Sequence, residues 1–115
     1  EIAPLPNELV LEKAAASAFH GTPLTFWLNY HGLDTVICCG ETTSGCVRAS
    51  VVDAATHRYS VGVVEECTFD RTEASHYINL FDMHQKYADV VTLPEAITYF
   101  DGIGEKAGTG AVLRA

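Results

Sequence analysis

The chain has 115 residues, a formal net charge of −8 and four cysteines. This length provides material for one small domain. Because the chain is acidic and its few lysines and arginines are scattered, we exclude a nucleic-acid-binding surface. No apolar run is long enough to cross a bilayer, and no signal-peptide pattern is present, so we expect a cytoplasmic protein that makes no contact with membranes.

Residues 7–13 alternate between apolar and polar side chains, with Leu9 and Leu11 on the face that carries Lys13. This period of two predicts a short strand that ends at Lys13. In open α/β sheets, ligands bind beyond the carboxyl ends of the strands. Lys13 is therefore a candidate functional residue, and the alternative is a solvated lysine at a strand end.

The stretch 34–48 combines an apolar strand, a glycine turn and the start of a helix. Residues 34–40 form a continuous apolar run typical of a buried parallel strand, and Gly40 lets the chain turn into a helix over 43–57. Cys46 then lies on the first turn of that helix, where free N–H groups and the helix dipole stabilise a thiolate. If strand 7–13 is parallel and close by, Lys13 adds a positive charge beside the same thiol. Cys46 is thus a candidate nucleophile, and the alternative is a buried structural thiol.

Two more strands are predicted over 59–66 and 90–93, with a helix between them that continues to residue 83. Asp70 is followed three residues later by Glu73, a capping-box-like start for that helix with Asp70 as the N-cap. The pattern predicts an α/β fold of three layers, α/β/α, with a mostly parallel Rossmann-like sheet to which this chain supplies about four strands.

The remaining cysteines and the histidines indicate no cofactor. Cys38 and Cys39 are neighbours in a strand and point to opposite faces, and Cys67 follows the next strand, so we interpret all three as reduced core residues. None of the five histidines has the close spacing of a zinc site. We predict neither a cofactor nor a metal for this chain.

The last fifteen residues, 101–115, are rich in glycine. No strand precedes them and they contain no Gly-Lys-Ser/Thr sequence, so a phosphate-binding loop is excluded. We divide the chain into a domain over 1–100 and this tail, and we expect the tail to contact a neighbouring subunit.

Three segments together resemble one known family. They are residues 12–24 (EKAAASAFHGTPL), residues 32–54 (GLDTVICCGETTSGCVRASVVDA) and residues 63–91 (VVEECTFDRTEASHYINLFDMHQKYADVV). The chain resembles the isochorismatase-like cysteine hydrolases, above all the amidase branch that includes N-carbamoylsarcosine amidohydrolases. The resemblance covers about residues 8–100, and the segment around Cys46 is its most specific part.

The resemblance implies roles for individual residues. Cys46 corresponds to the family nucleophile and Lys13 to its catalytic lysine. Glu41 and Thr42 correspond to a non-proline cis peptide, and the N–H groups of Thr42 and Cys46 to an oxyanion hole. Phe19 follows Lys13 on the connecting loop, so we expect it to form a wall of the substrate pocket.

The chain also departs from the family. Family members are longer, and their third catalytic group is an aspartate at the end of a first strand that lies upstream of anything similar to this sequence. Asp34 begins its strand at the wrong edge, Asp53 lies within a helix, and Asp70 is better placed as an N-cap. We therefore expect this chain to be the carboxyl-terminal portion of the fold, completed in a homo- or hetero-oligomer by a second polypeptide that carries the aspartate. In the nicotinamidase branch of the family, the ligands of a metal lie in that other part. The resemblance therefore leaves open whether the second polypeptide holds a metal.

The predicted function is cysteine-dependent hydrolysis of a small carboxamide or N-carbamoyl substrate to an acid and ammonia, through a thioester. One alternative is a non-catalytic subunit or binding protein with the same fold. Another is an isochorismatase proper, which hydrolyses a vinyl ether and needs no thiol, so the presence of Cys46 counts against it.

Overall fold

The computed structural model describes residues 3–107, with side chains described up to residue 104, and shows an α/β arrangement. Within these residues the elements follow one another along the chain as α1 (Leu24–Tyr30), β1 (Thr35–Glu41), the π-helical turn η1 (Thr43–Val47), α2 (Arg48–Thr56), β2 (Ser60–Phe69), α3 (Glu73–Lys86), β3 (Asp89–Val91) and α4 (Leu93–Ala107). The described strands form one parallel sheet in the order β1-β2-β3. The predicted α/β fold with a parallel sheet is therefore confirmed.

The sheet forms from runs of β-branched and apolar residues that are covered by helices. Cys38 of β1 pairs with Val63 of β2, and the register shifts by a bulge before Gly40 pairs with Thr68. Gly40 has φ +110°, a conformation that side chains with a Cβ rarely adopt, so glycine suits the end of this strand.

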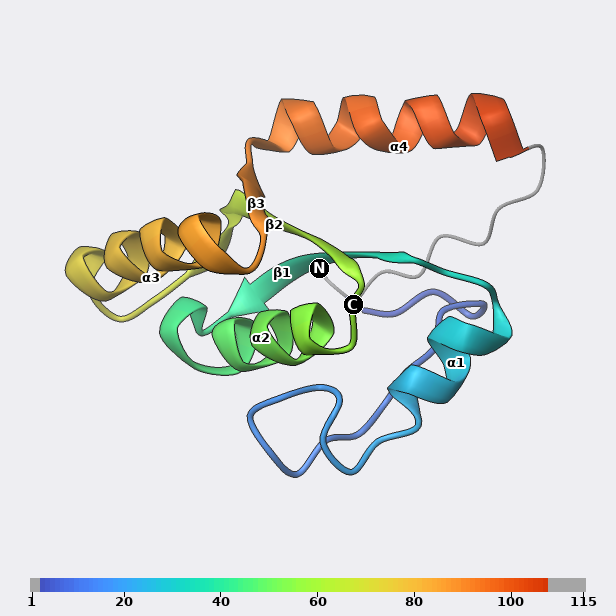
Figure 1. Cartoon of the computed structure of the whole chain (residues 1–115), viewed down its shortest axis with the longest axis horizontal. Helices are drawn as coiled ribbons and strands as arrows, with labels where there is room; N and C mark the ends of the chain where they lie inside the picture. Colours follow the sequence, from blue (N-terminus) through green and yellow to red (C-terminus); the bar gives the residue numbers. More distant parts are fainter. Residues whose placement is uncertain (1–2, 108–115) are drawn as a thin grey trace.

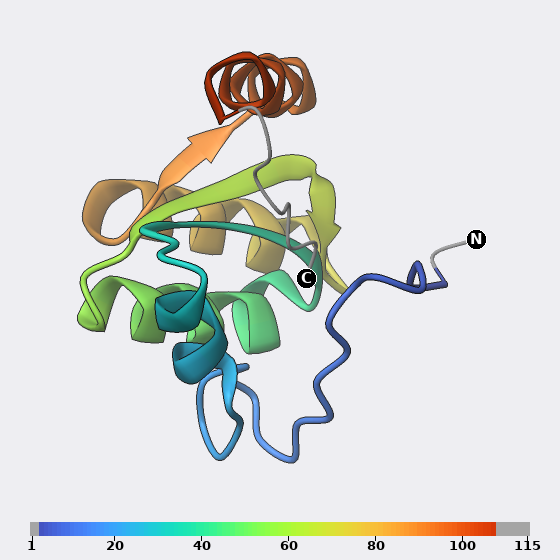
Figure 2. The ribbon, with the colours of Figure 1, turned by 90° about the vertical axis from the view of Figure 1, so that its right-hand side faces the viewer.

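The main core lies between the sheet and two helices, α2 and α3. Val51 and Ala54 of α2 and Met83 of α3 are fully buried, and they pack in one cluster with Cys38 and Val63 of the sheet. Figure 1 shows α2 and α3 beside the strands, with α4 on the other side. In Figure 2, α4 again lies apart from α2, across the sheet. Helices thus lie on both sides of the sheet, and α2 connects β1 to β2.

The predicted strand over residues 7–13 is wrong. These residues are irregular, pair with no strand of the described sheet, and leave the Val10 side chain 68% exposed. Alternation of apolar side chains does not make a strand unless a neighbouring strand accepts its backbone hydrogen bonds. The described residues therefore supply three strands rather than about four.

Other predicted boundaries also change. The predicted helix over 43–57 begins as η1, in which Gly45 departs from helical geometry (φ −110°, ψ −107°), and becomes regular only in α2. Residues 101–107, expected in the glycine-rich tail, belong to α4, and residues 108–115 lie outside the described residues. A subunit contact of the tail remains a prediction. In the part of the chain that is described, no helix combines the length and hydropathy needed to cross a membrane.

Candidate active site

Cys46 lies in the turn that joins β1 to α2, next to the carboxyl end of β1. The carbonyl of Thr42 accepts hydrogen bonds from the N–H groups of Gly45 (2.8 Å) and Val47 (3.2 Å), which close the turn around the cysteine. The Glu41–Thr42 peptide bond is cis, as the family resemblance implies. Cys46 itself is half-buried, so its sulfur lies at the surface of the turn rather than in the core.

Lys13 reaches Cys46 from the irregular amino-terminal segment. Its Nζ atom donates hydrogen bonds to the Cys46 Sγ atom at 3.3 Å and to the carbonyl of Ala15 at 2.9 Å. An ammonium group at this distance favours the thiolate form of a cysteine by Coulomb attraction. The predicted proximity of Lys13 and Cys46 is therefore present, although the strand from which we inferred it is not.

One hydrogen bond and one aromatic side chain fix the lysine segment against the rest of the fold. The N–H of Ala18 donates to Ser50 Oγ at 2.9 Å. Ser50 lies four residues after Cys46 and therefore projects from the same face of the helical segment. Phe19 is 8% exposed and belongs to the main core cluster. The face that presents the thiol thus also holds the segment that delivers the lysine.

Phe19 packs towards the end of α2, and its role as a wall of the substrate pocket remains a prediction. Its ring stacks on His57, at the end of α2, with 5.4 Å between ring centroids. Cys46 precedes the start of α2, and nine helical residues span roughly 13 Å. Phe19 is held by the apolar core.

Two contacts that we did not predict hold the turn containing Cys46, one from Asp70 in the β2–α3 connection and one from His76 near the start of α3. Asp70 Oδ2 accepts a hydrogen bond from the Ser44 N–H at 2.8 Å. The hydroxyl of Thr43, which is fully buried, lies 2.9 Å from His76 Nδ1. The predicted N-cap role of Asp70 is therefore wrong: Thr72 caps α3 by accepting from Ser75 N–H at 3.2 Å. The segment contains two side chains that could accept from a helix N–H, Asp70 and Thr72. The Asp70 carboxylate instead accepts from Ser44, in the turn that contains Cys46.

These contacts set the electrostatics of the turn. Hydrogen bonds from the hydroxyl and N–H of Ser44, with a smaller contribution from Arg71, hold the pKa of Asp70 below its usual range. The Ser44 N–H of the turn therefore already has an anionic partner. Lys13 is the cation in hydrogen-bond contact with the Cys46 sulfur, whereas the Ser44 N–H is paired with the Asp70 carboxylate.

The other cysteines have different surroundings. Burial, followed by the neighbouring Cys39, raises the pKa of the Cys38 thiol to about 12. Partial desolvation of the thiol, followed by the charge of Cys67 and a hydrogen bond with it, raises the pKa of Cys39 to about 11, although the residue as a whole is exposed. Both stay protonated at neutral pH, which makes them poor nucleophiles. All four cysteines are free; Cys38 is buried as expected, whereas Cys39 is exposed on the opposite face.

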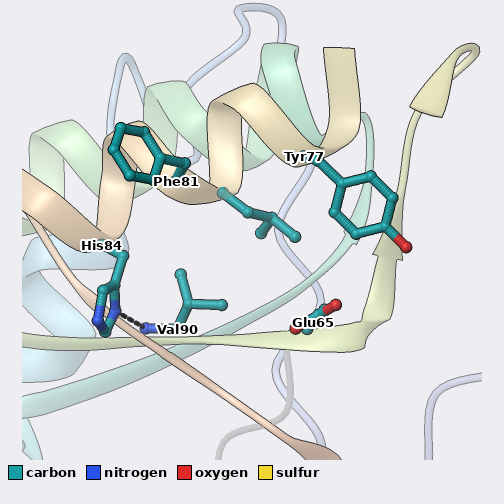
Figure 3. A pocket seen from close by; sticks show the side chains of 6 residues that line it. Glu65, Tyr77, Phe81, His84 and Val90 are labelled. Carbon is teal, nitrogen blue, oxygen red and sulfur yellow. Dashed lines mark hydrogen bonds between the residues drawn. The ribbon is translucent and has the colours of Figure 1, made fainter. Parts of the chain in front are cut away.

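Two of the shallow cavities on the described surface lie next to α3, and neither of these two is lined by Lys13 or Cys46. One of about 280 Å³ lies between α3 and the strands, where Tyr77, Phe81 and His84 surround it (Figure 3). The His84 side chain in it accepts a hydrogen bond from Val90 N–H at 3.0 Å. The other, of about 200 Å³, lies beside Asp70 and His76. Among the described residues, no three histidine, cysteine or carboxylate side chains gather as a metal site.

Residues 1–95 match the family model of the isochorismatase domain. The chain belongs to the isochorismatase family. It is similar to maleamate amidohydrolase of Pseudomonas putida, with 49% identity over 96 residues that cover 84% of this chain and 45% of that protein. It is also similar to N-carbamoylsarcosine amidase of an Arthrobacter species, with 37% identity over 102 residues that cover 89% of this chain and 39% of that protein.

A solved structure supports the same assignment. The isochorismatase-like hydrolase of Alkaliphilus metalliredigens matches with a TM-score of 0.82 and 30% identity, over 86% of this chain and 54% of that one. The chain spans less than half the length of the two amidohydrolases that it matches, and the match covers their carboxyl-terminal part. The family resemblance inferred from the three segments is therefore confirmed.

Proposed function

We propose that this chain provides the nucleophile and the lysine of an amidohydrolase that converts a small carboxamide or N-carbamoyl compound to an acid and ammonia. The contact between Lys13 Nζ and Cys46 Sγ at 3.3 Å is the observation that carries the proposal. It places a cation beside a thiol at the carboxyl edge of a parallel sheet, where ligands bind in α/β folds. The similarity to maleamate amidohydrolase and N-carbamoylsarcosine amidase supports the same class of reaction.

In the proposed reaction, the Cys46 thiolate attacks the carbonyl carbon of the amide and forms a C–S bond. The N–H groups of Thr42 and Cys46 hold the oxyanion that develops on the carbonyl oxygen. The C–N bond then breaks, the nitrogen leaves as ammonia after it gains a proton, and a thioester remains. Water attacks the thioester, which releases the carboxylic acid and restores the thiol.

The proton for ammonia requires an acid that we assign to a second polypeptide. Among the described side chains, no hydrogen bond or ion pair joins a carboxylate to Lys13 or Cys46. The family resemblance implies an aspartate upstream of the region matched here. We therefore propose that the partner presents this aspartate to the lysine and the thiol, and that activity requires both polypeptides.

The test is ammonia release by the purified protein, together with any polypeptide that co-purifies with it. Maleamate and N-carbamoylsarcosine serve as probe substrates because the two similar amidohydrolases are named for them. We expect turnover of at least one such small amide, and loss of it in Cys46→Ala. Cys67→Ala is the matched control, because it also removes a partly buried thiol but lies outside the nucleophile turn. Undiminished turnover in Cys46→Ala would reject the proposal and favour a reaction without a thiol.

A further inference from the structure

Two hydrogen bonds join the nucleophile turn to Asp70, in the connection between β2 and α3, and to His76, near the start of α3. The Ser44 N–H donates to Asp70 Oδ2 at 2.8 Å, and the Thr43 hydroxyl lies 2.9 Å from His76 Nδ1. The partners are 26 and 33 residues apart in the chain. Ser44 and Thr43 are the second and third residues before Cys46, so any shift of these contacts moves the sulfur as well.

The turn is closed by backbone hydrogen bonds to the Thr42 carbonyl, but it lacks a side-chain cap of its own. Its N-cap residue, Thr42, makes no capping hydrogen bond through its side chain, and Gly45 interrupts the helical geometry immediately before the cysteine. A helix start normally gains its first acceptor from the N-cap residue itself. Here the acceptor is instead the carboxylate of Asp70, which lies 26 residues after Ser44 in the chain.

We propose that Asp70 is a positioning residue for Cys46, acting through Ser44, with His76 as a second support through Thr43. This inference rests on the proposed function, because it concerns how the nucleophile is held during that reaction. Asp70 does not contact the sulfur. It fixes the turn so that the Cys46 sulfur stays within reach of Lys13 and in line with the N–H groups proposed to hold the oxyanion.

The hydrogen-bond geometry distinguishes positioning from a charge effect. The two Asp70 oxygens are used separately, with Oδ2 accepting from Ser44 N–H and Oδ1 from Arg71 N–H at 2.7 Å. An asparagine keeps one acceptor oxygen for Ser44 but loses the negative charge. A negative charge near Cys46 disfavours its thiolate. If Asp70 acted only through its charge, Cys46 would therefore react faster in Asp70→Asn than in the wild type.

The experiment compares Asp70→Ala with Asp70→Asn in the protein as purified with any partner. We expect Asp70→Ala to lower kcat by about tenfold to a hundredfold, as small displacements of a reacting group do, and to leave KM within about twofold. The pH at which iodoacetamide alkylates Cys46 should rise, because Cys46 moves away from Lys13. Asp70→Asn should recover most of the wild-type kcat and the wild-type alkylation profile.

The matched control is Glu95→Ala. Glu95 accepts from the N–H and the hydroxyl of Thr92, at 2.7 and 2.8 Å, so it is also a carboxylate that supports a helix start, but at α4. Its removal should leave kcat and Cys46 alkylation unchanged. If Asp70→Ala does not fold, Asp70→Glu keeps the charge and displaces the acceptor by one methylene, and the same loss of kcat is expected.

Two results would overturn the inference. If Asp70→Ala keeps the wild-type kcat and the wild-type alkylation profile, the turn does not need Asp70 to position Cys46. Equal losses in Asp70→Asn and Asp70→Ala would show that an acceptor oxygen at residue 70 is not enough to restore the site, so the hydrogen bond to Ser44 would not be what positions Cys46. Alkylation of Cys46 is measured without any substrate, so absence of amide turnover in the wild type would reject the proposed function while leaving this comparison valid.

Discussion

The Lys13 ammonium donates a hydrogen bond to the Cys46 sulfur across 33 residues of sequence, at 3.3 Å. Lys13 belongs to an irregular segment, and Cys46 to a turn at the end of a strand. An ammonium group beside a thiol is the arrangement that the proposed nucleophilic role of Cys46 requires.

We predict that Cys46→Ala or Cys46→Ser abolishes ammonia release while the circular dichroism spectrum stays that of the wild type. The sulfur is the proposed nucleophile, and its side chain is only half-buried, so its loss leaves the core intact. A Cys46→Ala protein with normal turnover would contradict the nucleophile assignment.

Iodoacetamide should distinguish the cysteines. The pKa values of Cys38 and Cys39 are raised to about 12 and about 11, so at pH 7 to 8 these thiols are almost entirely protonated and should react slowly. Cys46, beside Lys13, should be modified first, ahead of Cys67 as well. Mass spectrometry of peptides after short exposure measures the order, and preferential modification of Cys39 would show that its protonation does not protect it.

Lys13→Ala should raise the pH at which Cys46 is alkylated and reduce kcat much more than substrate binding. The variant removes the cation at 3.3 Å from the sulfur without touching the turn. Lys13→Arg keeps the charge but changes the shape of the donor, and it should restore the alkylation profile in part. An alkylation profile in Lys13→Ala that matches the wild type would leave Lys13 as a solvated lysine.

Ser50→Ala should weaken the same contact indirectly. Ser50 Oγ is the acceptor for Ala18 N–H at 2.9 Å, and this hydrogen bond holds the irregular segment that carries Lys13. Loss of the acceptor leaves a partly buried N–H unpaired, which costs about 1–3 kcal/mol. We expect a lower melting temperature and a Cys46 alkylation profile shifted towards that of Lys13→Ala. Ser50→Thr retains the hydroxyl and is the control.

Asp70 should titrate at an unusually low pH. Its pKa lies below the usual aspartate range because Ser44 donates to the charged form. A carboxyl group whose folded pKa is lowered contributes stability above its unfolded pKa and loses that contribution as the pH falls through the folded value. The Ser44 amide resonance should therefore keep its chemical shift through mildly acidic pH and change only below the usual aspartate pKa. In Asp70→Asn this change should be absent.

Local patterns in the sequence located the strand, turn and helix around Cys46, because apolar runs, glycines and helix starts leave signals a few residues long. The same kind of signal gave a wrong strand prediction at residues 7–13. Apolar and polar side chains alternate there, but no strand of the described sheet pairs with the segment. Such a signal also misled at Asp70, because the segment 70–73 offers two acceptors and local sequence does not say which one caps the helix.

The contacts that hold the candidate site were not predictable in this way. Asp70 with Ser44, His76 with Thr43 and Ala18 with Ser50 join residues 26 to 33 positions apart. Each is a single polar residue without periodicity or motif, so only the folded chain brings the partners together. The stacking of Phe19 on His57 was equally unpredictable, because the two residues are far apart in sequence and only burial of the aromatic ring in the core brings them together.

The last prediction is that this chain does not act alone. β1 lies at one edge of the described sheet, and the described residues pair only its other side, with β2. An unpaired strand edge binds other chains readily, and the apolar residues beside it need cover. We expect a second polypeptide to lie against β1 and the segment over residues 7–13, and to place an aspartate within hydrogen-bonding distance of Lys13 and Cys46.

Expressed without a partner, the 115-residue chain should aggregate or release no ammonia, and addition of the partner should restore activity. Size-exclusion chromatography with light scattering, followed by mass spectrometry of each fraction, identifies the polypeptides in the active species. Substitution of the partner's aspartate by asparagine should then abolish turnover while the complex persists. Full amidase activity from the purified monomeric chain would refute the prediction, because the proton for ammonia would then have to come from a carboxylate within this chain.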